Sequence, residues 1–129
     1  REKNSCPISK FIEPCNREGT GEKGSLKLDC KSRGLGDANT SRILKTFLPV
    51  EQTLGIIFLS NNSLTKVPKE IRQFSQLSSV DLQHNQIRSI GSGAFKFPDR
   101  VEEPGELDLS FNEISNISSG AFQGTLCAL

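Results

Sequence analysis

What this sequence lacks narrows its range of functions before any motif is considered. The 129 residues carry a formal net charge of only +1 at pH 7, so composition gives no electrostatic reason to expect nucleic acid or another polyanion as a partner. No run of apolar residues approaches the roughly 18 that a membrane-spanning helix needs. Length and composition therefore predict one domain with no membrane span and no nucleic-acid partner.

Methionine is also absent, and the chain begins at Arg1. We infer that an initiator methionine and the residues after it are missing. Removal of a signal peptide explains this, and so does trimming of a longer chain. The sequence leaves both explanations open.

What the sequence does contain is a frame of apolar residues around three asparagines. The frames are Ile57-x-Leu59-x-x-Asn62-x-Leu64, Val80-x-Leu82-x-x-Asn85-x-Ile87 and Leu107-x-Leu109-x-x-Asn112-x-Ile114. Further apolar residues follow each asparagine at fixed distances, namely Val67, Ile90 and Ile117, and then Phe95 and Phe122. This is the pattern of a leucine-rich repeat.

The repeat has a physical logic that predicts the fold. Apolar residues of the L-x-L stretch point inward from a short strand, and the asparagine turns the chain out of it while its amide pairs buried backbone groups. The sequence therefore predicts an α/β-type repeat solenoid with short parallel strands on its concave face. The second coil is the longest, and we expect its extra chain, the charged and proline-bounded segment 96–105, to form a loop.

The residues ahead of the first repeat contain Cys6, Cys15 and Cys30. A solenoid must seal its first coil, and a cysteine-linked hairpin does so where disulfides persist, outside the cytosol. The alternation from Leu26 to Cys30 predicts a strand of that hairpin. We expect a cysteine-containing cap with a short helix over residues 1–52 and about three repeats over residues 53–129, the last incomplete.

The helix of this cap is expected from Asp37 to Thr46, with Asp37 as its N-cap. Its apolar side chains recur at helical spacing, at Ile43, Leu44, Phe47 and Leu48.

Three N-glycosylation sequons strengthen the expectation of an extracellular, secreted protein. They are Asn39-Thr40-Ser41, Asn61-Asn62-Ser63 and Asn116-Ile117-Ser118. Asn39, Asn61 and Asn116 are thus the candidate glycan acceptors.

The N-terminal residues resemble a known group of proteins. The string Cys6-Pro7, Ile12-Glu13-Pro14-Cys15, Leu28-Asp29-Cys30 and Ile43-Leu44 to Phe47-Leu48-Pro49 is similar to the cysteine-rich cap of secreted arthropod leucine-rich repeat proteins. That group includes the non-catalytic subunit of Oplophorus-type luciferin 2-monooxygenase. The resemblance implies a secreted, non-catalytic binding or accessory-subunit role and names no partner.

The resemblance also implies a cysteine pairing. It favours a disulfide between Cys15 and Cys30, and it leaves Cys6 unpaired because Arg17 stands where the group usually has a further cysteine. Pairing of Cys6 with Cys15 is the main alternative. Cys127 lies about four strand steps of ~4.8 Å from the cap, beyond the ~7 Å that a disulfide tolerates. Cys6 and Cys127 are either buried thiols or partners in an intermolecular bridge.

The chain stops where a fourth coil would begin, with Leu126 and Leu129 as its first apolar positions. An uncovered last coil would present strand edge and apolar surface. We rank a longer natural chain first, a covering partner second and pairing with a second copy third. Self-association through this C-terminal edge is therefore kept as an alternative.

The strand residues that alternate with the core positions predict a concave binding face. The candidate partner-binding residues on it are Phe58, Asn61, Asp81, Gln83, His84, Glu106, Asp108, Phe111 and Glu113. Ile56, Ser60, Ser79, Gln86 and Ser110 are expected on the same face.

Neighbouring coils should stack their equivalent residues into rows. We expect Phe58, Asp81 and Asp108 in one row, and Asn61, His84 and Phe111 in another. The face would be acidic toward the third coil and would suit a basic or amine-bearing protein ligand, with Phe58 and Phe111 as apolar anchors. A sheet face merely kept solvated by its acidic residues explains the same pattern, and a glycan on Asn61 would cover part of it.

Catalysis is not expected, although His84, the single histidine, could meet Ser60, Asp81 and Asp108. A gently concave sheet offers no water-excluding pocket and no evident oxyanion donors. No repeated ligand spacing supports a metal site either. We therefore expect no enzyme activity, no cofactor and no metal.

Two functions remain. The first is a secreted binding protein or accessory subunit that recognises another protein through its concave face. The second is a structural or adhesive matrix component that assembles through its open ends.

Overall fold

The computed structural model describes residues 11–95 and 106–121. The expected loop 96–105, Cys6, Phe122 and the C-terminal residues Leu126, Cys127 and Leu129 lie outside the described residues. Among the described residues, no helix is long and apolar enough to cross a membrane.

Five short strands form the main sheet, in the order β1-β2-β3-β4-β6. They are β1 (Asn16–Glu18), β2 (Leu26–Asp29), β3 (Leu54–Phe58), β4 (Ser79–Asp81) and β6 (Glu106–Asp108). β1 is antiparallel to β2, whereas β2, β3, β4 and β6 run parallel. A second pair, β5 (Ser89–Ile90) and β7 (Asn116–Ile117), is also parallel. Parallel strands from successive coils match the repeat solenoid that the frame predicts.

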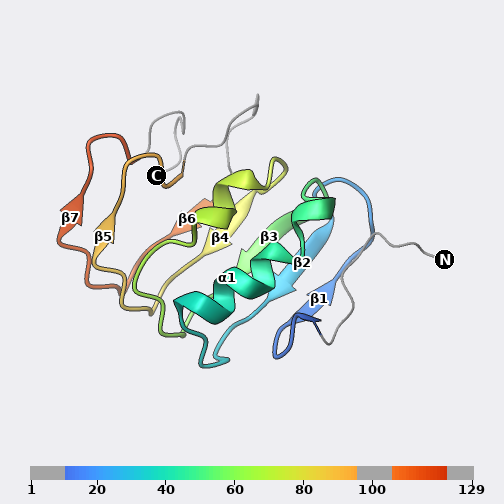
Figure 1. Ribbon diagram of the computed structural model, residues 1–129, viewed down its shortest axis with the longest axis horizontal. Coiled ribbons are helices and arrows are strands. Elements are labelled where there is room, and N and C mark those ends of the chain that lie inside the picture. Colours follow the sequence, from blue (N-terminus) through green and yellow to red (C-terminus); the bar gives the residue numbers. More distant parts are fainter. Residues whose placement is uncertain (1–10, 96–105, 122–129) are drawn as a thin grey trace.

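The helical segments lie together on one face of this sheet (Figure 1). They are α1 (Asp37–Lys45), η2 (Leu48–Val50) and η3 (Lys69–Gln73), and α1 contacts η3. The opposite face is formed by the strands alone (Figure 1). Side chains that point from the strands away from the helices therefore remain available to solvent or to a partner.

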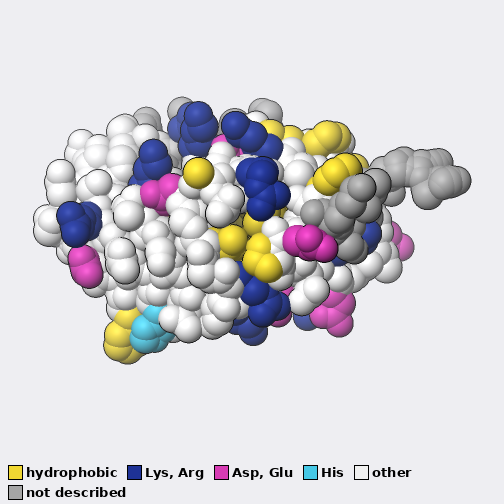
Figure 2. Space-filling model, turned by 60° about the horizontal axis from the view of Figure 1, so that its bottom comes forward, with side chains coloured by type: hydrophobic (Ala, Val, Ile, Leu, Met, Phe, Trp, Pro, Cys, Tyr) yellow, Lys and Arg dark blue, Asp and Glu magenta, His cyan; other side chains and the backbone are white. Residues whose placement is uncertain are grey.

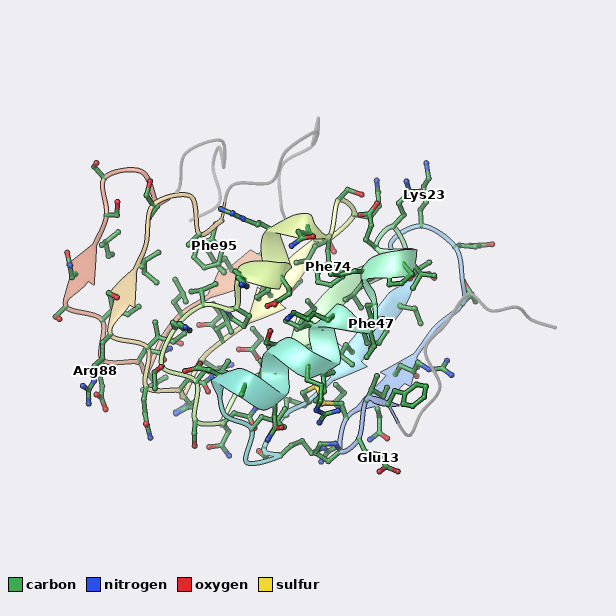
Figure 3. All side chains as sticks on the ribbon, in the orientation of Figure 1. Glu13, Lys23, Phe47, Phe74, Arg88 and Phe95 are labelled. Atoms are coloured by element: carbon green, nitrogen blue, oxygen red, sulfur yellow. A yellow bond between two sulfur atoms is a disulfide. The ribbon has the colours of Figure 1, made fainter. Side chains whose placement is uncertain are left out.

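The core lies between the two layers and repeats from coil to coil. Ile57 on β3 is the register partner of Leu28 on β2 and of Val80 on β4, and all three are buried. On the helical side, Phe47, Phe74 and Phe95 are each at most 1% exposed, and Figure 3 shows them spread along the long axis. Phe95 was predicted from the frame. Phe47 and Phe74 extend the same aromatic filling to earlier coils.

The β1–β2 hairpin occupies one edge of the main sheet, and a disulfide joins its residues Cys15 and Cys30. This is the pairing that the resemblance implied, and it excludes a bond between Cys15 and Cys6. Both sulfurs belong to buried residues that pack with Ile12. Next to this hairpin, Gly55 lets β3 approach the backbone before β2 closely, because a Cβ at Gly55 would lie 2.1 Å from the carbonyl oxygen of Gly24.

Two expectations for the helix and the face are wrong. The N-cap of α1 is Gly36, and Asp37 is the first helical residue. The Asp37 carboxylate instead accepts hydrogen bonds from the backbone N–H and hydroxyl of Thr65 in the next coil. Ser60, expected on the concave face, is buried at 9% exposure where the chain leaves β3.

The last described coil is less well buried than the frame predicts. Ile117 is 54% exposed, and Leu107, Leu109 and Ile114 are half-buried. Their equivalents in the middle coil, such as Leu82 and Ile87, have another described coil on each side and are fully buried. Burial at a repeat position thus depends on a neighbour as well as on residue type.

Candidate functional site

Three asparagine side chains join successive coils and set the shape of the concave face. In Asn62, Asn85 and Asn112, Oδ1 accepts a backbone N–H from the preceding coil, and Nδ2 donates to backbone carbonyls of both coils. For Asn85 the preceding-coil partners are the N–H of Leu64 and the carbonyl of Leu59, each at 3.0 Å. The pairing of buried backbone groups that the frame predicts is confirmed.

A first row of side chains crosses the strands where they end. Phe58, Asp81 and Asp108 are register partners, as expected, and Asp29 on β2 is a further member that the frame did not include. Oδ1 of each aspartate accepts the backbone N–H two residues later, at 3.0–3.1 Å. These turns direct the carboxylates along one edge of the sheet.

The structure lowers the pKa of Asp108 in this row. The Ser110 hydroxyl donates to it at 2.6 Å, and this bond is the main reason that its pKa lies below the ordinary value of 3.8. The Ser110 N–H and the nearby His84 lower the pKa further, and slight burial opposes them. The carboxylate is therefore anionic at neutral pH.

Charged side chains are distributed unevenly across the sheet. Lys27 on β2, Ile56 on β3, Ser79 on β4 and Glu106 on β6 are successive register partners. Glu18 on β1 is in turn the partner of Lys27, and Asp29 also lies on β2, so the β2 end of the face is mixed in charge, whereas Glu106 and Asp108 make the β6 end acidic. The acidity that was predicted toward the third coil is found at this β6 end.

Phe58 on β3 lies between these two ends of the face, and its ring is partly covered by Lys31. Lys31 places its Nζ 4.9 Å from the centroid of the Phe58 ring, and Phe58 itself is half-buried. Asp29 and Asp81 flank this ring in the strand register. Phe58 is therefore not an uncovered apolar anchor.

A second row follows directly after the strands and shares an unusual backbone. Ser32, Asn61, His84 and Phe111 have φ values of 55–59°, in the left-handed region. The N–H groups of Ser32, Asn61 and His84 donate to carbonyls of the next coil, for example Asn61 to Gln83 at 3.0 Å. The row of Asn61, His84 and Phe111 was expected, and Ser32 is an additional member.

The signal for the missed members was present in the sequence. Leu28-x-Cys30-x-x-Arg33-x-Leu35 repeats the apolar spacing of the frame, with Arg33 in place of the asparagine. Asp29, Lys31 and Ser32 lie inside this degenerate frame.

The aromatic end of the second row is well exposed. The His84 and Phe111 rings stack with centroids 4.3 Å apart and an interplanar angle of 5°, and Phe111 is 70% exposed. Figure 2 shows the cyan imidazole beside a yellow hydrophobic side chain, projecting at one edge of the surface. This stack and the Asp108 carboxylate lie at the same end of the face.

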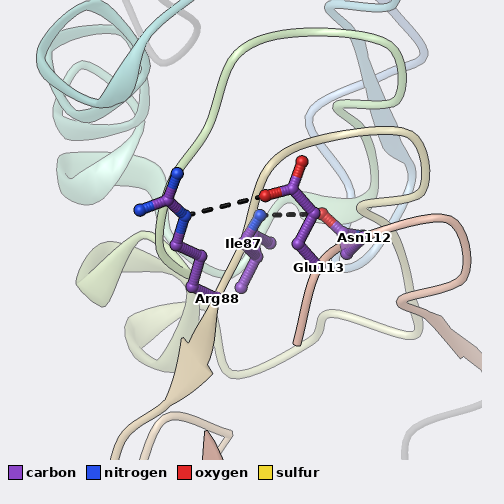
Figure 4. A network of polar contacts seen from close by, with 4 residues as sticks. All are labelled: Ile87, Arg88, Asn112 and Glu113. Carbon is purple, nitrogen blue, oxygen red and sulfur yellow. Dashed lines mark hydrogen bonds and ion pairs between the residues drawn. The ribbon is translucent and has the colours of Figure 1, made fainter. Parts of the chain in front are cut away.

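The other candidate residues make mostly local contacts. Gln83 donates to Asp81 at 3.1 Å, and Asn61 donates to the Ser32 hydroxyl at 2.9 Å. Figure 4 shows Glu113 paired with Arg88 at 3.6 Å, beside the hydrogen bond from the Ile87 N–H to Asn112. Both charged side chains of that pair are largely exposed, so the pair contributes little to stability.

The structure also places the three sequon asparagines and the residues considered for a catalytic triad, Ser60 and His84 among them. Asn39, Asn61 and Asn116 are all exposed. Ser60 is buried, while His84 stacks on Phe111 and, within the described part of the chain, has no side-chain hydrogen bond to a serine or carboxylate. Across residues 11–95 and 106–121, no group of three or more His, Cys, Asp or Glu side chains is arranged to hold a metal ion.

A cavity of about 410 Å³ lies on the opposite, helical side. Its lining includes Asp37, Ser41, Lys66, Lys69 and Glu70. Glu70 is 2% exposed; one carboxylate oxygen accepts from the Ser41 hydroxyl at 2.6 Å, and the other has no hydrogen-bond partner among the described residues. That second oxygen is also shielded from solvent, so it is not directly accessible to a ligand in the cavity.

Comparisons with known proteins agree with the geometry of the coils. Residues 75–126 match a family model described as leucine rich repeat. No curated protein and no solved structure matches the chain in these comparisons.

Proposed function

We propose, from the leucine-rich repeats in residues 75–126, that this chain is a secreted, non-catalytic protein that binds a protein partner through its concave face. Leucine-rich repeats offer extended concave surfaces that bind other proteins. The role is that of a recognition protein or an accessory subunit. The resemblance of its N-terminal residues to the cap of secreted arthropod proteins supports the subunit role.

One observation carries the proposal. The part of the face formed by β4 and β6 combines the acidic residues Asp81, Glu106 and Asp108 with Phe111, a large apolar side chain that is 70% exposed. Exposed aromatic side chains beside fixed charges are typical of protein-binding surfaces. Such a surface suits a partner that presents basic and apolar groups together.

The disulfide and the exposed sequon asparagines support secretion. The disulfide between Cys15 and Cys30 is of a kind that persists in oxidising compartments. Asn39, Asn61 and Asn116 are exposed, as glycan acceptors must be. Mass spectrometry of the protein from its source would test the proposal directly, since unmodified sequons and free Cys15 and Cys30 thiols would contradict it.

The test of partner binding is capture from the source secretion with the wild type and with Asp81→Lys/Asp108→Lys. We expect the variant to lose the captured protein, because both half-buried carboxylates lie on this face and their long-range attraction for a basic partner would become repulsion. The matched control is Glu13→Lys/Glu22→Lys, which makes the same change in net charge at exposed positions of the hairpin edge. Thermal melts establish that all variants stay folded.

The matrix alternative is distinguished by a third variant, Leu126→Asp/Leu129→Asp. A protein that assembles through its ends would lose self-association in this variant and keep it in the concave-face variant. Loss of capture only in the edge variant would overturn recognition through the concave face.

A further inference from the structure

Phe111 is an unusual residue type for its position in the repeat. Its φ of 57° is in the left-handed region, where side chains with a Cβ are disfavoured and asparagine or glycine is usual. Its side chain is also 70% exposed, so it buries little apolar surface. The repeat sets the backbone conformation here, but the packing does not require a large apolar side chain, and this is a reason to look for a binding role.

The stack with His84 determines what Phe111 presents. At a centroid separation of 4.3 Å and an interplanar angle of 5°, one face of the phenyl ring is covered by the imidazole. The other face of the ring points away from the imidazole, and Phe111 as a whole is 70% exposed. A flat, oriented aromatic face attracts cations through its quadrupole.

The same surface already contains a cation on an aromatic ring. Lys31 lies over Phe58 at 4.9 Å, and Asp29 and Asp81 are the register neighbours of that ring. An aromatic face near carboxylates therefore binds an ammonium group within this chain. Among the described residues, no cation lies over Phe111.

A carboxylate also precedes Phe111 in the same coil, at Asp108. Asp108 accepts the Ser110 N–H and hydroxyl, which fixes it at the turn that leads into Phe111. The hydrogen bonds from Ser110 lower its pKa, so the carboxylate is charged at neutral pH. Glu106 adds negative charge on the same strand.

We propose that the outer face of Phe111, together with the Asp108 carboxylate, binds an arginine side chain of the protein partner. A planar guanidinium can stack on the ring while its edge donates to the carboxylate, whereas the compact ammonium of lysine does so less well. This arginine site rests on the proposed function and specifies the partner's chemistry.

The experiment is an NMR titration with the acetylated and amidated peptide Gly-Arg-Gly-Arg-Gly. His84 is the only histidine, so its ring protons form an unambiguous reporter beside the site. We expect saturable shifts of the His84 and Phe111 ring signals. The same peptide with citrulline in place of arginine keeps the shape without the charge and should bind at least about 5-fold more weakly.

Variants decide whether the two named groups are responsible. Phe111→Leu and Asp108→Asn should each weaken binding of the arginine peptide by about 3-fold or more. Phe58→Leu is the matched control and should leave affinity within about 2-fold, because Lys31 already occupies that ring. Amide spectra show that each variant is folded.

Equal binding of the citrulline peptide, or unchanged affinity in folded Phe111→Leu, would overturn the arginine site. Partner capture separates this result from the proposed function. If Asp81→Lys/Asp108→Lys abolishes capture and Phe111→Leu leaves it intact, the arginine site is wrong and concave-face recognition stands.

Discussion

Asn85 shows at the scale of one residue how the coils are held together. Its amide reaches four backbone groups, namely the Leu64 N–H and the carbonyls of Leu59, Leu82 and Gln83, at 3.0–3.2 Å. It is 6% exposed, so water cannot replace these bonds. Alanine at this position leaves several buried polar groups unpaired.

We predict that Asn85→Ala lowers the free energy of unfolding by about 1–3 kcal/mol. Denaturant melts measure the loss. Gln86→Ala, at the next and exposed position, is the control and should change stability by less than about 0.5 kcal/mol. Equal effects of the two substitutions would contradict the role assigned to the asparagine row.

Asp108 gives a second prediction for a single residue, in its dependence on pH. Its folded pKa is lowered below 3.8, chiefly by the Ser110 hydroxyl. Its contribution to stability is therefore present above pH 3.8 and is lost as pH falls through the folded pKa. A carboxyl NMR titration should give a midpoint below 3.8 in the wild type and a higher one in Ser110→Ala. A midpoint unchanged by Ser110→Ala would refute the assigned cause.

At the scale of elements, the β1–β2 hairpin depends on a covalent closure. The disulfide joins residues that are 15 positions apart in the chain. In the chain-entropy model, a loop of that length contributes about 3 kcal/mol by restricting the unfolded state. The bond also lies in the core, because Cys15 and Cys30 are buried.

Cys15→Ala/Cys30→Ala is expected to lose roughly 3 kcal/mol, measured by denaturant melts under oxidising conditions. Wild-type protein under reducing conditions is the comparison. A double variant as stable as the oxidised wild type would show that the hairpin is held by packing alone.

The elements differ in how far the sequence predicts them. Period-two spacing and a repeated asparagine were enough for the strands of the three repeats, because equivalent residues of stacked coils must share one register. The start of α1 was predicted one residue late. Asp37 resembles an N-cap by residue type, but its carboxylate bonds to Thr65 in the next coil, and sequence-local reasoning does not include that partner.

At the scale of the whole molecule, the candidate face was also only partly predictable from the sequence. Its two rows follow from strand register and were predictable. The contact of Lys31 with Phe58 and the stack of His84 on Phe111 were not, because they depend on side-chain directions between coils. The left-handed backbone of Phe111 was also not predictable, because phenylalanine rarely adopts a positive φ.

Burial along the solenoid predicts a gradient of local stability. The Leu59 and Leu82 amides donate across the main sheet at 2.8 Å from fully buried residues. The Ser118 amide donates to Ile90 at 2.9 Å next to Ile117, which is 54% exposed. Native-state hydrogen exchange should be on the order of 100-fold faster at Ser118 than at Leu59 and Leu82. Uniform protection would indicate a single cooperative unit.

The asparagine row also gives the molecule a direction. The Leu64 N–H belongs to one coil, and the side chain that satisfies it, Asn85, belongs to the next. The Leu35 N–H depends in the same way on Asn62. During synthesis from the N-terminus, each coil therefore emerges before the asparagine that hydrogen-bonds its buried backbone N–H group. We therefore expect folding on the ribosome to lag translation by one repeat, with the newest coil left open.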